Sequence, residues 1–311
     1  PSTEDPHNIT AFLADGGIGR VWLAQDQQVQ RQVVLKQLLP GFQNNDGAKH
    51  RFVNEAKVTG RLQHPNIVPV YSMNWDNDDS PFYTMKYIRG DTLAAHLEDY
   101  HNSEAKAFID LQSLLDSFLS VCQAIAYAHD RGIIHRDIKP ENIAIGEFGE
   151  VTVLDWGLAD NYDADADSSR TSGVLGTPNY MPPEQATGKE MTGPFSDIYS
   201  LGAILFEIIC GSVPRYKERQ QRGLDELLSS IIAGDIPDAT KHCPFRLKGL
   251  AFIANKCLHV EPQLRYRTVG ELISDIRAWK NDLPITARPD NFTRAISRTM
   301  RHNRRTLFAA G

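Results

Sequence analysis

The most restrictive feature of this 311-residue chain is the segment His135–Asn142, which reads H-R-D-I-K-P-E-N. It places a carboxylate, Asp137, and an amide, Asn142, on one short polar stretch with Lys139 between them. An aspartate can accept a proton from a hydroxyl group, and carboxylate and amide oxygens suit Mg²⁺ as ligands. The alternative to a catalytic, metal-binding segment is a chance polar turn after a helix. The segments on either side decide between these two interpretations.

Three segments upstream carry charged or flexible residues in a fixed order. Leu13–Val21 is rich in glycine, and glycines allow backbone N–H groups to approach phosphate oxygens closely. About 17 residues later, the apolar run Val33–Lys36 ends in a lysine. A helix predicted over residues 47–62 then carries Glu55 beside a partly apolar face. Each of these features alone could be a flexible hairpin, a solvated lysine or an ordinary surface glutamate.

Four further segments follow downstream. Val153–Gly157 is an apolar strand end followed by Asp155, which in isolation could be an ordinary turn residue. Gly176–Gln185, Ser196–Gly202 and Glu261–Arg265 come next in the chain. The last of these could be no more than exposed charges.

Together these elements resemble, in order and spacing, the motifs of eukaryotic-like (Hanks-type) bacterial serine/threonine protein kinases. The resemblance covers about residues 9–281 and includes the H-R-D-x-x-x-x-N, V-A-I-K and D-F-G patterns. The chain departs from the family at four positions, where the usual Gly, Ala, Phe and Ala are replaced by Ala14, Val34, Trp156 and Pro182. No departure removes a catalytic group.

The resemblance implies a role for each motif residue. Asp137 is expected to act as the base, and Lys139 to reach the transferred phosphoryl group. The expected catalytic set is Lys36, Glu55, Asp137, Lys139 and Thr177, and the expected metal ligands are Asn142 and Asp155. The residues expected around ATP are Leu13, Ala14, Asp15, Gly16, Gly17, Ile18, Gly19, Val21, Val34, Lys36, Met85, Lys86, Tyr87 and Ile88. Structural roles are expected for Arg136, Glu184, Asp197 and Arg265, with Glu184 and Arg265 as a pair.

The implied fold is α+β and two-lobed. We expect a polar tail over residues 1–8, a small β-rich N-lobe with one helix over 9–88, a large helical C-lobe over 89–281, and a basic segment over 282–311. Strands are predicted at 66–71 and 81–90, and apolar spacing predicts helices at 111–126 and 198–210. Residues 98–109 and 215–223 are polar and are predicted to be exposed connections.

Composition excludes several other classes of protein. The four cysteines are widely spaced without a C-x-x-C pair, which argues against a zinc site or a disulfide framework and for a reducing compartment. The net charge is −6, but residues 283–311 carry six arginines and one aspartate, so the rest of the chain is strongly acidic. An acidic body argues against nucleic-acid binding.

The expected function is transfer of the γ-phosphate of ATP to serine or threonine of protein substrates, with Mg²⁺ or alternatively Mn²⁺. Lys139 favours Ser/Thr acceptors by the resemblance. A pseudokinase scaffold is the alternative, and a small-molecule phosphotransferase is disfavoured by the activation segment between Asp155 and Glu184. We expect the kinase to be activated by phosphorylation of Thr171, with Ser172 as the second choice. Arg136 is free to pair with that phosphate. A second copy of the chain could act in trans.

The arginine-rich C-terminal segment also carries a prediction about location. Arg301, Arg304 and Arg305 precede the apolar stretch 306–311, which is typical of the cytoplasmic flank of a membrane span. We therefore expect a cytoplasmic kinase domain, followed past Gly311 by a helix in the inner membrane. An amphipathic helix over 291–308, lying on the kinase or on anionic lipid, is the competing interpretation.

Overall fold

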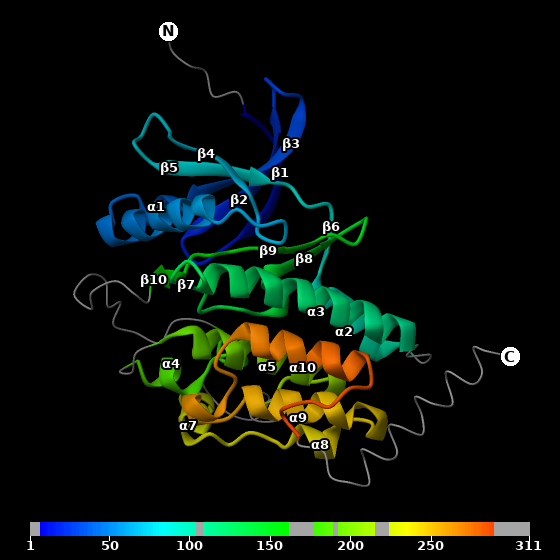
Figure 1. Cartoon of the computed structure of the whole chain (residues 1–311). Helices are drawn as coiled ribbons and strands as arrows, with labels where there is room; N and C mark the ends of the chain where they lie inside the picture. The colour runs from blue at the N-terminus through cyan, green and yellow to red at the C-terminus, as the bar shows by residue number, and fades with distance from the viewer. Residues whose placement is uncertain (1–6, 104–107, 162–176, 189–191, 215–223, 289–311) are drawn as a thin grey trace, which may run out of the picture.

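The computed structural model of the chain describes residues 7–103, 108–161, 177–188, 192–214 and 224–288. A β-sheet with one helix lies above a larger, mainly helical part (Figure 1). This is the two-lobed α+β arrangement that the sequence predicts.

The N-lobe is built on a five-stranded antiparallel sheet in the order β1-β2-β3-β5-β4. Its strands are β1 (His7–Asp15), β2 (Gly19–Asp26), β3 (Arg31–Leu38), β4 (Val70–Trp75) and β5 (Pro81–Lys86). Helix α1 (Asp46–Arg61) begins where the Asn45 side chain accepts a hydrogen bond from the Ala48 N–H, a typical N-cap. Its buried face packs Phe52 and Ala56 against the sheet.

Two N-lobe boundaries differ from the prediction. Strand β1 begins at His7, so the predicted tail is two residues too long, because His7 and Asn8 pair with β2. The strand predicted at 66–71 begins four residues too early: β4 begins only at Val70, and Ile67 forms an isolated parallel bridge to Val153 in the C-lobe. An apolar run does not have to form a strand to be buried, because one β-bridge between the lobes also places its side chains in the interior.

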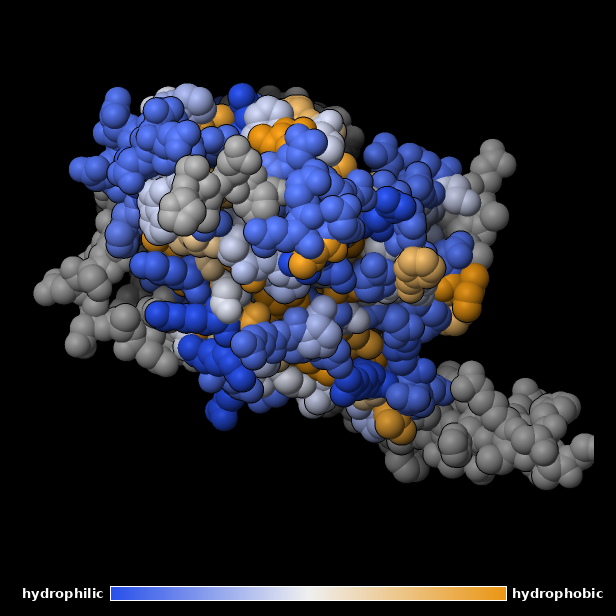
Figure 2. Space-filling view, turned by 90° about the horizontal axis from the view of Figure 1, so that it is seen from above, coloured by the Kyte–Doolittle hydropathy of each residue, from blue (hydrophilic) through white to orange (hydrophobic). Residues whose placement is uncertain are grey.

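The outer face of the N-lobe is mostly hydrophilic. Seen from above, it shows hydrophobic residues only in small, separate patches (Figure 2). Exposed apolar side chains of this lobe include Ile9, Phe12, Val29 and Trp75. Scattered apolar residues of this kind are normal on a protein surface.

The C-lobe is mainly helical, with short strands at its upper edge. Its helices are α2 (Leu93–Asn102), α3 (Phe108–His129), α4 (Pro183–Thr187), α5 (Pro194–Cys210), α7 (Leu224–Ala233), α8 (Ala239–His242), α9 (Lys248–Cys257) and α10 (Val269–Lys280). Its strands are β6 (Gly90–Thr92), β7 (Ile133–Ile134), β8 (Ile143–Gly146), β9 (Val151–Val153) and β10 (Asp160–Asn161). The connection predicted at 98–109 is exposed at most of its described residues, as expected, but it is partly helical: it contains the end of α2, with Tyr100 buried, and the start of α3.

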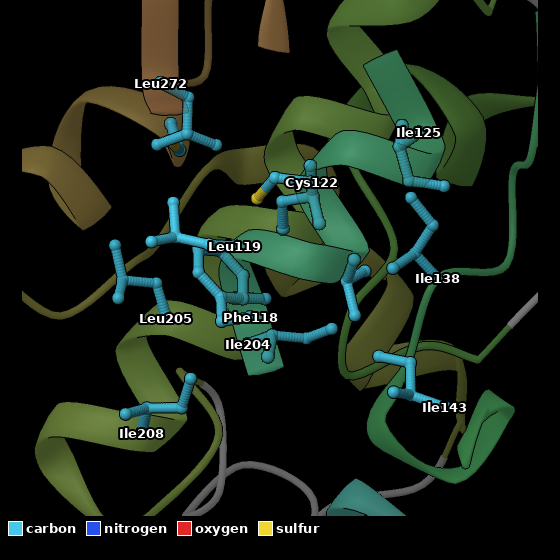
Figure 3. Close-up of a cluster of buried hydrophobic side chains, with 14 of the residues drawn as sticks. Phe118, Leu119, Cys122, Ile125, Ile138, Ile143, Ile204, Leu205, Ile208 and Leu272 are labelled. Carbon is cyan, nitrogen blue, oxygen red and sulfur yellow. The ribbon is translucent and has the colours of Figure 1, made fainter. Parts of the chain in front are cut away.

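One hydrophobic core joins α3, α5, α9 and α10 (Figure 3). Helix α5 is buried along most of its length, as its nearly continuous apolar sequence predicts. At Gly202 a Cβ atom would collide with Cys257, so this glycine allows α5 and α9 to approach closely. The tightly packed α5 provides a rigid base for the residues described below.

Helix α3 is the one helix among the described residues that is long and apolar enough to cross a membrane by length and composition alone. Its apolar face, including Leu111, Leu115 and Phe118, is buried in the C-lobe core. Packing in a soluble core accounts for this composition.

The last described residues belong to the folded lobe. The carboxylate of Asp275 accepts hydrogen bonds from the N–H groups of Thr286 and Ala287 at 2.7 and 2.9 Å. Ile285 and Ala287 pack against the C-lobe core. The predicted basic segment over 282–311 therefore begins several residues too early; residues 289–311 lie outside the described part.

Candidate active site

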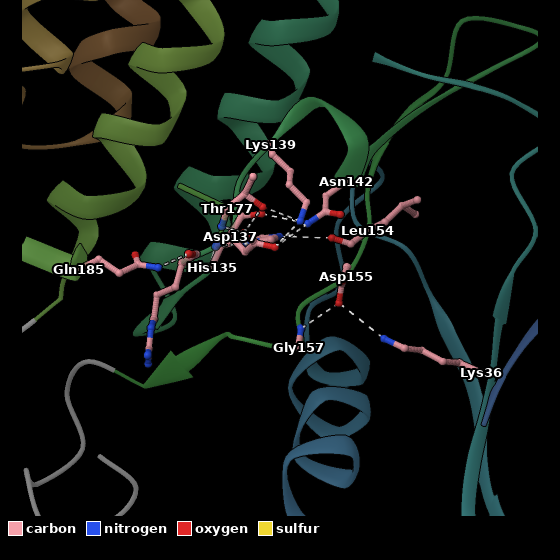
Figure 4. Close-up of polar contacts among 11 residues, drawn as sticks. Lys36, His135, Asp137, Lys139, Asn142, Leu154, Asp155, Gly157, Thr177 and Gln185 are labelled. Carbon is pink, nitrogen blue, oxygen red and sulfur yellow. Dashed lines mark hydrogen bonds and ion pairs between the residues drawn. The ribbon is translucent and has the colours of Figure 1, made fainter. Parts of the chain in front are cut away.

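The segment His135–Asn142 follows α3 and lies between β7 and β8, at the upper edge of the C-lobe (Figures 1 and 4). Its backbone is hydrogen-bonded to Asp197 at the start of α5. The Asp197 carboxylate accepts the N–H groups of His135 and Arg136, both at 2.9 Å, and contacts His129 Nε2 at 2.7 Å. Burial opposes ionisation of Asp197, but these donors outweigh it and hold its pKa below the usual value.

Asp137 lies at the centre of a compact hydrogen-bond cluster (Figure 4). Lys139 Nζ donates to Asp137 Oδ2 and to Thr177 Oγ1, both at 2.8 Å. The N–H and hydroxyl of Thr177 also reach Asp137 Oδ1, at 3.0 and 3.2 Å. The predicted base, the predicted lysine and the predicted threonine are therefore in mutual contact. This geometry fixes one carboxylate orientation and places a positive charge beside it.

Asn142 has an amide orientation suited to metal binding. Its Nδ2 donates to the Asp137 carbonyl oxygen at 3.0 Å and to Asp137 Oδ2 at 3.3 Å. Because the nitrogen faces the loop, Oδ1 is turned away from it and can serve as a ligand. With Asp155 this gives two oxygen donors, a set that suits Mg²⁺ or Mn²⁺.

No group of three or more His, Cys, Asp or Glu side chains suited to a metal ion occurs within the described ranges. Two protein ligands completed by phosphate oxygens are a usual arrangement for Mg²⁺. The residues present therefore fit a metal ion that is bound together with a nucleotide.

Lys36 on β3 faces this cluster from the N-lobe. Its Nζ lies 2.5 Å from Glu55 Oε1 on α1 and 3.6 Å from Asp155 Oδ1. Glu55 Oε1 also accepts a hydrogen bond from Tyr83 at 2.7 Å. The three predicted residues Lys36, Glu55 and Asp155 thus meet where the two lobes join.

The electrostatics of this group favour its charged forms. Burial acts to lower the pKa of Lys36, but Glu55, Tyr83 and Asp155 outweigh it, so the pKa of Lys36 lies well above its usual value. Burial acts to raise the pKa of Asp155, but Lys36, His135 and the Gly157 N–H hold it below its usual value. A fixed ammonium next to a fixed carboxylate is suited to binding phosphates and a metal ion together.

Trp156, which replaces the phenylalanine of the family pattern, is fully buried. It is only 1% exposed, and its ring lies 4.5 Å from the His135 ring, measured between centroids. This contact joins the Asp155 turn to the catalytic loop. Moving so large a side chain out of its site would require a large apolar area to be exposed.

The glycine-rich turn connects β1 and β2 above Lys36. The Gly16 N–H donates to the Gly19 carbonyl at 2.7 Å, and Asp15 pairs with Arg20 at 2.6 Å across the two strands. The Arg20 hydrogen bond holds the pKa of Asp15 below its usual value. A Cβ atom at Gly19 would lie 3.0 Å from Lys36 Cε, so this turn lies directly against the lysine.

The other residues expected around ATP lie on neighbouring strands. Val21 is the register partner of Lys36, and Val34 is paired with both Leu23 and Met85. Residues Lys86–Ile88 follow Met85 at the end of β5. The Lys86 N–H donates to the Pro69 carbonyl at 3.1 Å, which fixes the backbone at the start of this segment.

The buried pair Glu184–Arg265 is present in the C-lobe. Arg265 donates to both oxygens of Glu184, at 2.8 and 2.9 Å, and Ser196 donates to Oε1 at 2.9 Å. The alternative of two exposed charges is wrong, because both side chains are buried.

Arg136 has a partner that the sequence analysis did not foresee. Its Nη1 pairs with Asp160 on β10 at 2.9 Å. The pairing of Arg136 with a phosphate on the activation segment stays a prediction. A phosphate on the activation segment would have to compete with Asp160. The predicted phosphorylation sites, Thr171 and Ser172, lie outside the described residues.

Tyr83 and His129 were also missed. For Tyr83 a signal existed: β5 side chains alternate between two faces, so Tyr83 lies on the same face as Met85. For His129 and Asp160 no local pattern existed, because their contacts join segments far apart in the chain.

The fold and this site define a protein kinase domain, and comparison with known families agrees. The protein kinase domain family matches residues 8–275, so the chain belongs to that family. Members of the family use ATP with a divalent metal ion and act on protein substrates.

The chain is also similar to two chlamydial proteins called serine/threonine-protein kinase PknD. It is 36% identical over 301 residues to the one from Protochlamydia amoebophila, which covers 89% of this chain and 30% of that protein. It is 35% identical over 295 residues to the one from Chlamydia pneumoniae, covering 88% of this chain and 31% of that protein. The chain thus spans less than a third of the length of these relatives.

Proposed function

We propose that the chain is the catalytic domain of a protein serine/threonine kinase that transfers the γ-phosphate of ATP to protein hydroxyl groups. The observation that carries this proposal is the bridge formed by Lys139, whose Nζ donates to both Asp137 and Thr177 at 2.8 Å. It leaves Asp137 oriented to accept a hydroxyl proton and leaves the ammonium next to the atom that receives the phosphate. The relatives called serine/threonine-protein kinases support the same acceptor class.

The roles of the other residues follow from their chemistry. Lys36, held by Glu55, would bind the α- and β-phosphates, and Asn142 and Asp155 would hold the metal ion. When bound, that ion neutralises charge on the phosphates. We propose Mg²⁺ rather than Mn²⁺, because two oxygen ligands completed by phosphates are typical of Mg²⁺ sites.

The test is a transfer assay with γ-labelled ATP, Mg²⁺ or Mn²⁺, and a mixture of unrelated proteins, followed by identification of the labelled amino acids. We expect phosphoserine and phosphothreonine, and higher activity with Mg²⁺. Transfer only to tyrosine would overturn the acceptor assignment. Absence of any transfer, together with intact nucleotide binding, would instead support the pseudokinase alternative, which no observation favours.

We also propose that the domain is cytoplasmic and tethered to the inner membrane in the full-length protein, with a second copy acting in trans. The arginine-rich segment of residues 288–305 supports the tether, because such segments flank membrane spans on the cytoplasmic side. Fractionation of the full-length protein tests it: recovery in the soluble fraction would rule it out. Action by a second copy is tested by measuring the rate of autophosphorylation at several kinase concentrations, because phosphorylation in trans slows as the concentration falls.

A further inference from the structure

Tyr83 and Lys36 donate hydrogen bonds to one and the same oxygen of Glu55. The Tyr83 hydroxyl lies 2.7 Å and Lys36 Nζ 2.5 Å from Glu55 Oε1. Tyr83 and Lys36 are register partners on the adjacent strands β5 and β3, so the sheet itself holds both donors side by side. Tyr83 and Glu55 are each 3% exposed, so water does not compete for this oxygen.

The two donors are not equivalent. Lys36 also lies 3.6 Å from Asp155 and, in the proposed function, has to bind nucleotide phosphates as well. Its charge is therefore shared among several anions. Among the described residues, the Tyr83 hydroxyl donates to Glu55 alone. A buried carboxylate that loses a partner is strongly disfavoured.

The ring of Tyr83 contacts the same helix. It lies 5.3 Å from the Phe52 ring, measured between centroids, and belongs to the small cluster that packs α1 on the sheet. Tyr83 therefore holds α1 at two points, by its ring at Phe52 and by its hydroxyl at Glu55.

We propose that Tyr83 is a positioning residue for phosphoryl transfer: its hydroxyl keeps Glu55 directed at Lys36 while Lys36 binds phosphate, and so keeps α1 packed against the sheet. This inference rests on the proposed function. It assigns to β5 a role in the reaction beyond that of lining the nucleotide site.

Tyr83→Phe tests the proposal, because it removes the hydroxyl and keeps the ring contact with Phe52. The matched control is Tyr266→Phe, since Tyr266 is equally buried and donates to a buried carboxylate, Asp275, at 2.6 Å. We expect kcat of Tyr83→Phe to fall about tenfold with KM for ATP changed less than about threefold, the effect of losing one hydrogen bond to a charged acceptor. Tyr266→Phe is expected to lower stability and leave kcat unchanged.

Two further readouts separate positioning from general destabilisation. Hydrogen exchange of the amides of α1 should accelerate in Tyr83→Phe but not in Tyr266→Phe. In a Glu55→Ala background, adding Tyr83→Phe should cause no further loss of kcat. Should Tyr83→Phe fail to fold, Tyr83→Met removes the same hydroxyl and serves in its place.

Equal kcat for wild type and Tyr83→Phe would overturn the proposal, as would equal losses in the two tyrosine variants. If the wild type transfers no phosphate at all, the proposed function fails instead. In that case, unchanged exchange in α1 of Tyr83→Phe would still refute the positioning contact.

Discussion

The backbone N–H of Arg136 donates a hydrogen bond to Asp197 Oδ1 at 2.9 Å, and Arg136 has a left-handed φ of 69°. A residue other than glycine held in this region costs about 1–3 kcal/mol unless its surroundings impose it. Asp197 is fully buried at the start of α5, so a helix buried along most of its length imposes the conformation of the catalytic loop. The direction of the Asp137 side chain depends on this backbone.

Replacing Asp197 with alanine should therefore affect both stability and catalysis. We expect Asp197→Ala to lower the free energy of unfolding by about 3 kcal/mol, because buried N–H groups lose their acceptor. We also expect kcat of the folded enzyme to fall at least about 100-fold, because Asp137 loses its orientation. Denaturant unfolding and a kinase assay measure the two effects. Asp275→Ala, which removes another buried acceptor far from the site, should lower stability alone; equal kcat losses would contradict this role.

Asp137→Asn and Asp155→Asn should separate the base from the metal ligand. Each is expected to lower kcat at least about 100-fold, the scale of general-base and electrostatic contributions. Asp137→Asn should bind ATP with unchanged affinity, whereas Asp155→Asn should lose the part of the affinity that depends on Mg²⁺. Nucleotide titration with and without Mg²⁺ measures this difference. Full activity of either variant would show that the assignment is wrong.

Sequence reasoning located this site because its residues occur in short segments with fixed spacing. Lys36, Asp137 and Asp155 each end or follow a short apolar run, and this arrangement is visible in the chain itself. Partners supplied by distant segments were not visible: nothing near Asp160 indicates that β10 will bring it to Arg136.

The basic character of the predicted segment 282–311 comes from Arg288 and from five arginines at 294–305. Net charge does not show that residues 282–288 belong to the folded lobe, where Asp275 binds the backbone of Thr286 and Ala287. Tyr83 could have been predicted from the two-residue period of β5, because Met85 was already assigned to the nucleotide face.

Phosphorylation of the activation segment should be detectable, and we expect the phosphate to act by pairing with Arg136. After incubation with ATP, we expect phosphate on Thr171 or Ser172, located by mass spectrometry. The phosphate would displace Asp160 from Arg136, since a doubly charged group binds a guanidinium more strongly than a carboxylate does. Thr171→Ala combined with Ser172→Ala should lower activity, and Asp160→Asn should not. No phosphate at these two residues, or full activity of the double variant, would contradict the prediction.

Arg265→Ala should be among the most destabilising substitutions in the C-lobe. It leaves Glu184 buried without its bidentate partner, and breaking a buried pair in this way costs about 3–5 kcal/mol. Arg265→Lys should recover only part of the loss, because a lysine cannot bind both carboxylate oxygens in the same geometry. Denaturant unfolding provides the measurement. A loss below about 1 kcal/mol, the usual value for an exposed pair, would show that the pair is solvated.

Glu207 should make stability depend on pH near neutrality. It lies on α5 and accepts a hydrogen bond from the Tyr180 hydroxyl at 2.7 Å. Burial raises its pKa from 4.5 to about 7, the Tyr180 hydrogen bond opposes this rise, and the nearby charge of Glu141 adds to it. The folded state therefore holds the proton over a pH range in which the unfolded state has lost it. The free energy of unfolding must fall as pH rises through that range, and the loss is complete only above the folded-state pKa.

Glu207→Gln keeps an acceptor for Tyr180 and removes the charge, so it tests this dependence directly. We expect the variant and the wild type to have similar Tm values near pH 5, and the variant to be more stable by roughly 2 °C or more near pH 8. Because the two proteins share all their other titratable groups, the difference between their Tm values at each pH reports Glu207 alone. Parallel Tm curves for Glu207→Gln and wild type would show that Glu207 ionises in the folded state as it does in the unfolded chain.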